Sequence, residues 1–482
     1  MEKKSVRENY FLNMIYQVLA ILTPIITAPY VSRHLGASAI GTVGYVASIF
    51  TYFSLVCDLG LNSHGQLAVA YNQKDKDKIS QCYWEIITFK SILTILVLIV
   101  YYIMFCINND YSLLFKFYII SFITKIFDVT WYFNGIENFS KIVYKNIFVK
   151  LLSVVLIFVL IKTPEDINKY ALLYLGADFL SMLLLYWDIG KYINLPKKKL
   201  NLTQHIKPSL ILFIPQVATM VYVLLDKTML GKILGDMAEV GFYEQGEKIV
   251  KILMTIITTI GTVMTPRIAS CIAEKQYDKI NFYLKKSYEY IFFIGIPMVL
   301  GLIVVADNFC PLFFGEGYDK VPFIMICLSP IILFISMSSL SKAYLVPAKR
   351  MRAYYISMFS GTILNFLLNL FLIPVIKSYG AAIATIAAEL LIASVQLYCI
   401  RNVLDIKATM KIGLKYLSFG IIMYISCMLV NLITDDLLYS LLLQVFTGVV
   451  VYILLLVITK DEMFEYIFKM VKNYFNKILK HS

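Results

Sequence analysis

The stretch LYSLLLQVFTGVVVYILLLVI, residues 438–458, contains no charged residue. A helix needs about 20 predominantly apolar residues to cross roughly 30 Å of hydrocarbon. This segment is therefore long and apolar enough to span a lipid bilayer as a helix. Thirteen earlier stretches of the chain have a similar length and character.

The composition of the whole chain agrees with this reading. Hydrophobic residues make up 59% of the 482 residues and charged residues only 16%, whereas about 25% of the residues in soluble domains are charged. The expected spans lie at residues 10–31, 40–59, 83–105, 113–133, 143–161, 170–189, 210–230, 240–265, 288–306, 321–340, 354–375, 381–400, 414–433 and 438–458. The predicted fold class is an all-α polytopic membrane protein with fourteen transmembrane helices and no large soluble domain.

Lysine and arginine are concentrated in every second gap between these spans. An excess of these residues in short loops marks the cytoplasmic side of a membrane, so both termini are predicted to be cytoplasmic. Most of the formal net charge of +13 is then this excess of basic residues in cytoplasmic loops, which lie against an anionic inner leaflet. No nucleic-acid partner is expected. The tail beyond Lys460 alternates apolar residues and lysines at helical spacing, which predicts a basic amphipathic helix on the inner surface.

Two short motifs recur along the chain at an offset of about 200 residues. Leu-Gly followed by a second glycine occurs at residues 35–41 and 234–241, and Asp-Lys-Ile occurs at 77–79 and 278–280. Such a repeat of six spans predicts two lobes with the same orientation, facing a central cavity, as in rocking alternating-access transporters. The expected parts are a six-helix lobe at 1–200, a second at 201–400, and two further helices with the basic tail at 401–482.

Several ionisable residues fall inside the expected spans. A charge at mid-bilayer costs at least about 2.5–3.5 kcal/mol, so these residues should face a wet cavity, pair with each other or lie near an interface. The candidate cavity cations that would bind an anionic substrate are Lys90, Lys125, Lys150, Lys227, Lys248 and Lys251. The candidate acids for pairing or ion coupling are Asp128, Asp178, Asp226, Glu244 and Glu247.

The spacing of these charges separates two groups. Three acid–lysine pairs lie three or four residues apart on one helix, where side chains share a face, and self-neutralised packing is an equal alternative for them: Lys125 with Asp128, Glu244 with Lys248, and Glu247 with Lys251. Lys90 and Lys150 have no acid nearby on their own helix. They are the stronger candidates for binding an anion, unless they reach an interface or pair with another span.

Polar side chains also form a stripe on the first span. Asn9, Asn13 and Gln17 recur at four-residue spacing on an otherwise apolar helix. A polar stripe is costly against lipid, so it should face the cavity or another helix. The eight cysteines are scattered singly, without metal-type spacing, and are expected to be apolar fillers, with no metal site.

Several segments resemble those of bacterial polysaccharide repeat-unit flippases, which belong to the multidrug/oligosaccharidyl-lipid/polysaccharide exporter superfamily. The most specific is FDVTWYFNGIENF at 127–139. The other similar segments are LTPIITAPYVSRHLG at 22–36, DKTMLG at 226–231, VGFYEQGEKI at 240–249 and TVMTPRI at 262–268. The resemblance extends over essentially the whole chain.

The resemblance implies two six-helix lobes around a cationic cavity, with extra C-terminal helices. It also implies a bacterial inner-membrane protein that moves a lipid-linked oligosaccharide, usually on undecaprenyl diphosphate, from the cytoplasmic to the outer leaflet for surface polysaccharide assembly. The expected partners are this lipid, the bilayer, a polysaccharide polymerase and glycosyltransferases. No cofactor is expected, and the expected energy source is a proton gradient, a sodium gradient or the membrane potential.

Three alternatives stay open at this point. A cation-coupled drug exporter of the same superfamily would favour an acidic, aromatic cavity over one rich in lysine. A lipid II-type flippase would carry arginines in the middle of its first span, and this chain has none there before Arg33. A membrane polysaccharide polymerase or ligase would need clustered acids, histidines or arginines in a large outer loop, so the chain is not expected to be an enzyme.

Overall fold

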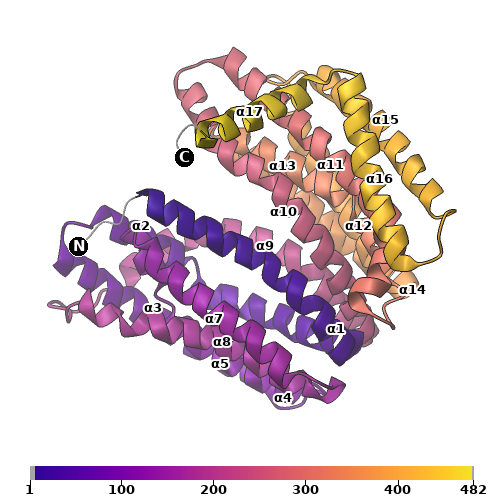
Figure 1. Ribbon diagram of the computed structural model, residues 1–482. Coiled ribbons are helices and arrows are strands. Elements are labelled where there is room, and N and C mark those ends of the chain that lie inside the picture. The colour runs from indigo at the N-terminus through magenta and orange to yellow at the C-terminus, as the bar shows by residue number, and fades with distance from the viewer. Residues whose placement is uncertain (1–5, 480–482) are drawn as a thin grey trace. The chain divides into compact units, whose positions relative to one another are not determined.

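The computed structural model describes the backbone of residues 6–479, without the side chains of 6–13, 215, 218, 219, 221, 471 and 473–479. Within this range the chain forms helices joined by turns and contains no β-strand (Figure 1). It divides into two compact units, Met1–Gly241 and Phe242–Ser482. The predicted all-α fold class is confirmed.

The first unit begins with a long helix and ends in the first turn of α10. Its helices are α1 (Val6–Asp58), α2 (Leu61–Tyr71), α3 (Lys76–Tyr101), α4 (Ser112–Phe117), α5 (Ile119–Phe127), α6 (Thr130–Gly135), α7 (Phe139–Leu160), α8 (Ile167–Trp187) and α9 (Ile206–Leu234). Short helical turns follow α3, flank α8 and precede α9: η1 (Tyr102–Cys106), η2 (Pro164–Asp166), η3 (Ile189–Lys191) and η4 (Thr203–His205).

The second unit contains the rest of α10 (Met237–Ala273) and all later helices. These are α11 (Tyr277–Phe314), α12 (Val321–Leu328), α13 (Ile331–Leu345), α14 (Met351–Ile400), α15 (Ile406–Val430), α16 (Leu437–Ile458) and α17 (Glu462–Leu479). α15 and α16 pack on α11, where the Tyr452 hydroxyl of α16 donates a hydrogen bond of 2.8 Å to the Phe293 carbonyl.

Helices occupy all the segments that were expected to span the membrane. Ten helical segments of the described chain are long and apolar enough to cross a bilayer. Two of them contain a backbone break, at Gly36 in α1 (φ 77°) and at Ile376 and Lys377 in α14. Both breaks fall in gaps between expected spans, so each of these helices holds two of them. The polytopic class is confirmed, and the count of fourteen crossings stays a prediction.

The fourth expected span, residues 113–133, is not one helix. The chain forms α4, α5 and α6 there, with an extended residue, Asp128 (ψ 103°), between α5 and α6. The Asp128 carboxylate accepts a hydrogen bond of 3.0 Å from the Thr130 backbone N–H. Aspartate satisfies backbone donors at the start of a helix, so it ends one helix and begins the next.

The second glycines of the repeated motif contact each other in the first unit. A Cβ atom on Gly41 would lie 1.8 Å from the Met237 carbonyl oxygen and 2.6 Å from the Gly241 nitrogen. A Cβ atom on Gly241 would lie 2.0 Å from the Ala37 carbonyl oxygen. α1 and the first turn of α10 therefore pack backbone against backbone, which only glycine permits.

The predicted C-terminal helix is present as α17. Its start is fixed by Asp461, which is buried, accepts a hydrogen bond of 2.9 Å from the Phe464 backbone N–H, and lies 2.5 Å from the Lys415 ammonium. Tyr466 and Phe468 are largely exposed. The position of this helix on the membrane surface stays a prediction.

Replacing Gly241 with valine should destabilise the first unit, because a side chain there meets the Ala37 backbone, which cannot rotate away. Overpacking of this kind costs about 1–3 kcal/mol. The matched control is Gly176→Val on α8, where nothing lies within 4 Å of the added Cβ atom. The thermal unfolding midpoint of the two purified variants in one detergent tests this, and equal midpoints would contradict the close packing.

Candidate functional site

A cluster of charged side chains lies among the helices of the first unit. It contains four lysines and three aspartates, which leaves one excess positive charge. The lysines are Lys90 on α3, Lys125 on α5, and Lys145 and Lys150 on α7; the aspartates are Asp58 at the end of α1, Asp128 between α5 and α6, and Asp178 on α8.

The centre of this charge cluster is a buried ion pair. Lys90 is fully buried, its ammonium donates a hydrogen bond of 2.8 Å to the Asn62 side-chain oxygen, and it lies 3.6 Å from the Asp128 carboxylate. The Asn62 amide donates a hydrogen bond of 3.1 Å to the same carboxylate. Of the alternatives left open for Lys90, the structure shows pairing with another span. Two buried charges satisfy each other here, with an amide completing the triangle.

The family-specific segment 127–139 builds the corner that holds Asp128. Trp131 is 1% exposed, and its indole N–H donates a hydrogen bond of 3.1 Å to the Asp128 carbonyl. The ring fills the space beside Gly65 of α2, where an added Cβ atom would lie 2.5 Å from the indole. Tyr132 and Phe133 are also buried. The packing of these aromatic residues thus stabilises the break between α5 and α6 and fixes the position of the Asp128 carboxylate.

Lys145 is a member of the charge cluster that the sequence analysis missed. It is 8% exposed, and its ammonium donates a hydrogen bond of 3.0 Å to the Ser181 carbonyl of α8. The signal was present, because Lys145 lies inside the expected span at 143–161.

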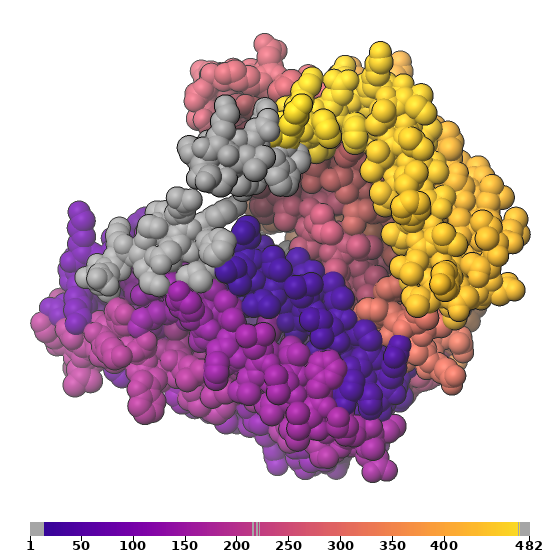
Figure 2. All heavy atoms as spheres, viewed as in Figure 1, coloured from indigo at the N-terminus to yellow at the C-terminus, as the bar shows by residue number. Residues whose placement is uncertain are grey.

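The other members of the charge cluster are more accessible. Lys125 and Lys150 are half-buried and Asp178 is exposed, and Asp178 interacts electrostatically with Lys125, Lys145 and Lys150. The Lys150 ammonium lies 5.8 Å from the centre of the Tyr16 ring on α1. α1 and α7 lie side by side, as the indigo and magenta surfaces show (Figure 2). Solvent exposure therefore increases across the charge cluster, from the buried pair of Lys90 and Asp128 to the accessible Lys125 and Lys150.

The polar stripe of the first span lies on α1, where Gln17 is exposed. The side chains of Asn9 and Asn13 lie outside the described residues, so the stripe's orientation stays a prediction.

The remaining predicted cations lie on α9 and α10. Asp226, which is buried, and Lys227 lie next to each other on α9. On α10, Lys251 forms the expected ion pair with Glu247 at 2.6 Å. Lys248 donates a hydrogen bond of 3.0 Å to the Gln245 side chain, and Glu244 lies one turn before it. The α10 charges belong to the second unit, whereas the charge cluster belongs to the first.

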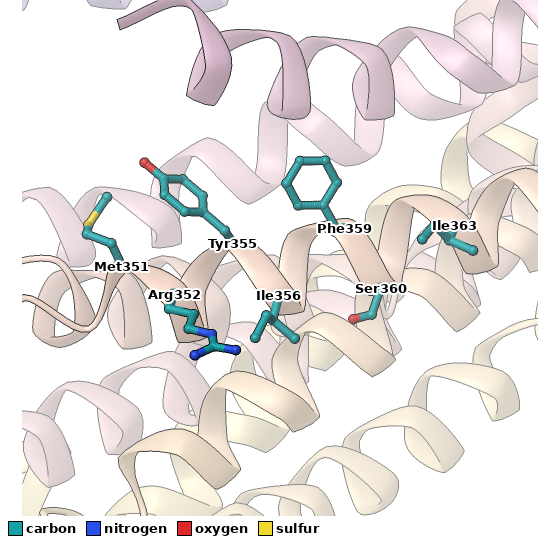
Figure 3. Close-up of a pocket in the computed structure, with 7 residues that line it drawn as sticks. All are labelled: Met351, Arg352, Tyr355, Ile356, Phe359, Ser360 and Ile363. Carbon is teal, nitrogen blue, oxygen red and sulfur yellow. The ribbon is translucent and has the colours of Figure 1, made fainter. Parts of the chain in front are cut away.

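A surface hollow of about 570 Å³ lies along the first turns of α14 in the second unit (Figure 3). Its lining is apolar and aromatic, with Tyr355, Ile356 and Phe359 among its walls, and Arg352 is the charge at its edge. This lining does not suit a charged sugar headgroup. The described residues also contain no cluster of histidine, cysteine or acidic side chains that could hold a metal ion.

The chain is similar to known proteins over most of its length. The family described as polysaccharide biosynthesis proteins matches residues 6–272, and the MatE family matches residues 212–371. A protein of Escherichia coli (strain K12) named "Putative O-antigen transporter" is 24% identical over 410 residues, which cover 83% of this chain and 98% of that protein. Its namesake from Shigella dysenteriae is 23% identical over 402 residues, 82% of this chain and 100% of that protein.

Solved structures share the fold. The lipid II flippase MurJ in an inward closed conformation has a TM-score of 0.73 at 18% identity, covering 94% of this chain and 99% of that chain. An inward-facing multidrug resistance MATE family transporter has a TM-score of 0.62 at 13% identity, covering 82% and 96%. Since the family match at residues 6–272 covers more than half of the sequence, the chain belongs to the polysaccharide biosynthesis protein family.

Proposed function

We propose that this chain is a flippase that moves a lipid-linked oligosaccharide from the cytoplasmic to the outer leaflet by alternating access, for surface polysaccharide assembly. The observation that carries the proposal is the charge cluster of the first unit, with one excess positive charge. Five of its seven charged groups lie on α1, α3, α7 and α8, in helical segments long and apolar enough to cross a bilayer. The full-length similarity to O-antigen transporters supports it.

The chemistry of the substrate explains the need for such lysines. A sugar on a diphosphate cannot enter hydrocarbon, whereas a polar passage can carry the headgroup while the lipid tail stays in the bilayer. Lysine ammonium groups bind phosphate as point charges. Lys125 and Lys150, as the accessible cations of the charge cluster, would bind the headgroup, and the buried Lys90 would hold their surroundings in place.

The membrane potential favours this direction of transport. A headgroup with about two negative charges that moves outward gains roughly 4–5 kcal/mol at an inside-negative 100 mV. The empty protein returns without the substrate and its negative charge. A proton or sodium gradient would drive this return step. The proposed location is the bacterial inner membrane with both termini cytoplasmic, and the proposed partners are a polysaccharide polymerase and glycosyltransferases.

The alternatives differ from this proposal mainly in substrate. A lipid II-type headgroup carries the same diphosphate, and the likeness to MurJ concerns the fold. A cationic drug would meet the excess positive charge of the charge cluster, which argues against a drug exporter. The relatives are named as transporters or flippases, and we propose no catalytic activity.

Neutralising the accessible lysines should reduce transport. Removing a hydrogen bond to a charged group costs about 1.5–3 kcal/mol, so Lys125→Ala combined with Lys150→Ala should slow flipping by at least about tenfold. The readout is accumulation of lipid-linked oligosaccharide in the inner leaflet of cells that carry only the variant. Lys116→Ala on α4, an exposed lysine of the same unit, is the control. Flipping at the unaltered rate, with normal protein levels, would remove both lysines from the site.

The buried pair should behave as a scaffold. Asp128→Asn leaves the Lys90 ammonium buried without its carboxylate, and breaking one side of such a pair costs about 3–5 kcal/mol. The double variant Lys90→Met, Asp128→Asn should recover most of this loss, because replacing both buried charges by uncharged groups is often close to neutral. Thermal unfolding in detergent compares the three proteins. A double variant less stable than Asp128→Asn would show that the charges do not act on each other.

A further inference from the structure

The linker between α8 and α9, residues 189–205, lies along the first turns of α3. The Asn194 backbone N–H donates to the Ser80 hydroxyl at 3.0 Å, and the Trp84 indole donates to the Asn194 carbonyl at 2.9 Å. Lys197 forms an ion pair of 2.6 Å with Asp77. The linker connects the sixth and seventh expected spans, so this attachment fixes where α9 begins.

Glu85 is the centre of this attachment. Its carboxylate is 3% exposed and accepts four hydrogen bonds. The donors are the Gln204 side chain at 2.6 Å, the Gln81 side chain at 2.8 Å, the His205 Nε2 at 2.9 Å and the Asn201 backbone N–H at 3.0 Å. Three of these donors belong to the linker. One carboxylate on α3 thereby holds the last five residues before α9.

Two imidazole rings extend the hydrogen-bond network from Glu85, first His205 and then His64. The His205 Nδ1 lies 2.8 Å from the His64 Nε2, and His205 is 5% exposed. Because an ionised carboxylate can only accept, the His205 Nε2 must carry a hydrogen. In the uncharged pair the His205 Nδ1 then accepts from the His64 Nε2–H. His64 is half-buried. Its Nδ1 is the last atom in this series of hydrogen-bonded groups.

His64 and His205 also line a pocket of about 570 Å³ with mixed polar walls. The other titratable groups that line this pocket, besides Glu85, come from the start of α3, its capping residue and the linker: Asp75, Asp77, Lys78, Cys82, Lys197 and Lys198. Lys78 pairs with Asp75 at 3.3 Å and Lys197 with Asp77. Among these acids, Glu85 is the one that accepts a hydrogen bond from the pair, at 2.9 Å from the His205 Nε2.

The hydrogen bonds from His64 to His205 and from His205 to Glu85 allow one proton to be relayed between the two rings. A proton from water in the pocket binds to the His64 Nδ1, and the hydrogen on the His64 Nε2 passes to the His205 Nδ1. His64 is left neutral as its other tautomer, and His205 becomes an imidazolium that donates to Glu85 on one side and to His64 on the other. Charge-assisted hydrogen bonds of this kind are about twice as strong as neutral ones.

We propose that His64, His205 and Glu85 form a proton-binding site that fastens the linker to α3 when the proton is bound. His64 receives the proton, and His205 holds it against Glu85. The added stability is present at low pH and is lost as the pH rises and the proton leaves, which weakens the hold on the start of α9. The use of this step in transport rests on the proposed flippase function, since it gives the empty protein a proton-dependent change.

Hydrogen–deuterium exchange of the full-length protein in lipid nanodiscs tests the site. After correction for intrinsic rates, amides of residues 189–205 should be protected about tenfold more at pH 6 than at pH 8.5, because the bound proton strengthens the hydrogen bonds that hold the linker. Tenfold corresponds to about 1.4 kcal/mol. His205→Gln, which keeps a donor and an acceptor but cannot take the charge, should abolish this difference. His34→Gln is the control, since His34 bonds to the Tyr30 carbonyl of its own helix.

A wild-type linker whose corrected exchange does not change with pH would overturn the proposal, whatever the variants do. A His205→Gln protein with the full wild-type response would also overturn it. Flipping of lipid-linked oligosaccharide is measured separately on the same proteins. A chain that flips the lipid but shows a flat exchange profile loses this inference alone, whereas a pH-responsive linker without flipping removes the proposed function alone.

Discussion

The ion pair between Lys90 and Asp128 is the constraint on which the first unit depends. An ammonium that is fully buried requires a carboxylate and a hydrogen-bond acceptor within reach, and Asp128 and Asn62 supply them. Asp128 can reach Lys90 only because the chain breaks between α5 and α6 at that residue. The break in turn requires the buried Trp131 and the glycine beside it. The break between α5 and α6 thus places the carboxylate that neutralises the buried Lys90 ammonium.

The same pairing separates two roles among the lysines. Lys90 and Lys145 are buried, and their ammonium groups bind protein groups, the Asp128 carboxylate and the Ser181 carbonyl. Lys125 and Lys150 keep partial exposure and share the exposed Asp178 as an electrostatic neighbour. A transport site for an anion needs cations that can exchange a protein or water partner for the substrate, and only the accessible lysines meet this condition. Buried cations fix the geometry around them.

Much of the fold could be predicted from the sequence, because hydrophobic length and loop charge are local properties. The repeated Leu-Gly motif also pointed to positions that matter, since Gly41 and Gly241 meet in the structure. The partner of Lys90 could not be predicted, because Asp128 lies in a break between α5 and α6 that periodicity does not reveal. The proton chain at Glu85 was also hidden, since His64, Glu85 and His205 are joined only when the linker folds onto α3.

Purified chain in lipid vesicles gives the most direct test of the central claim that it moves a lipid-linked oligosaccharide. A fluorescent oligosaccharide on undecaprenyl diphosphate is placed in both leaflets, and a membrane-impermeant reagent quenches the headgroups on the outside. With the protein present, we expect headgroups from the inner leaflet to become accessible and fluorescence to fall well below the level left in protein-free vesicles. A protected fraction equal to that of protein-free vesicles, with the protein correctly folded, would contradict it.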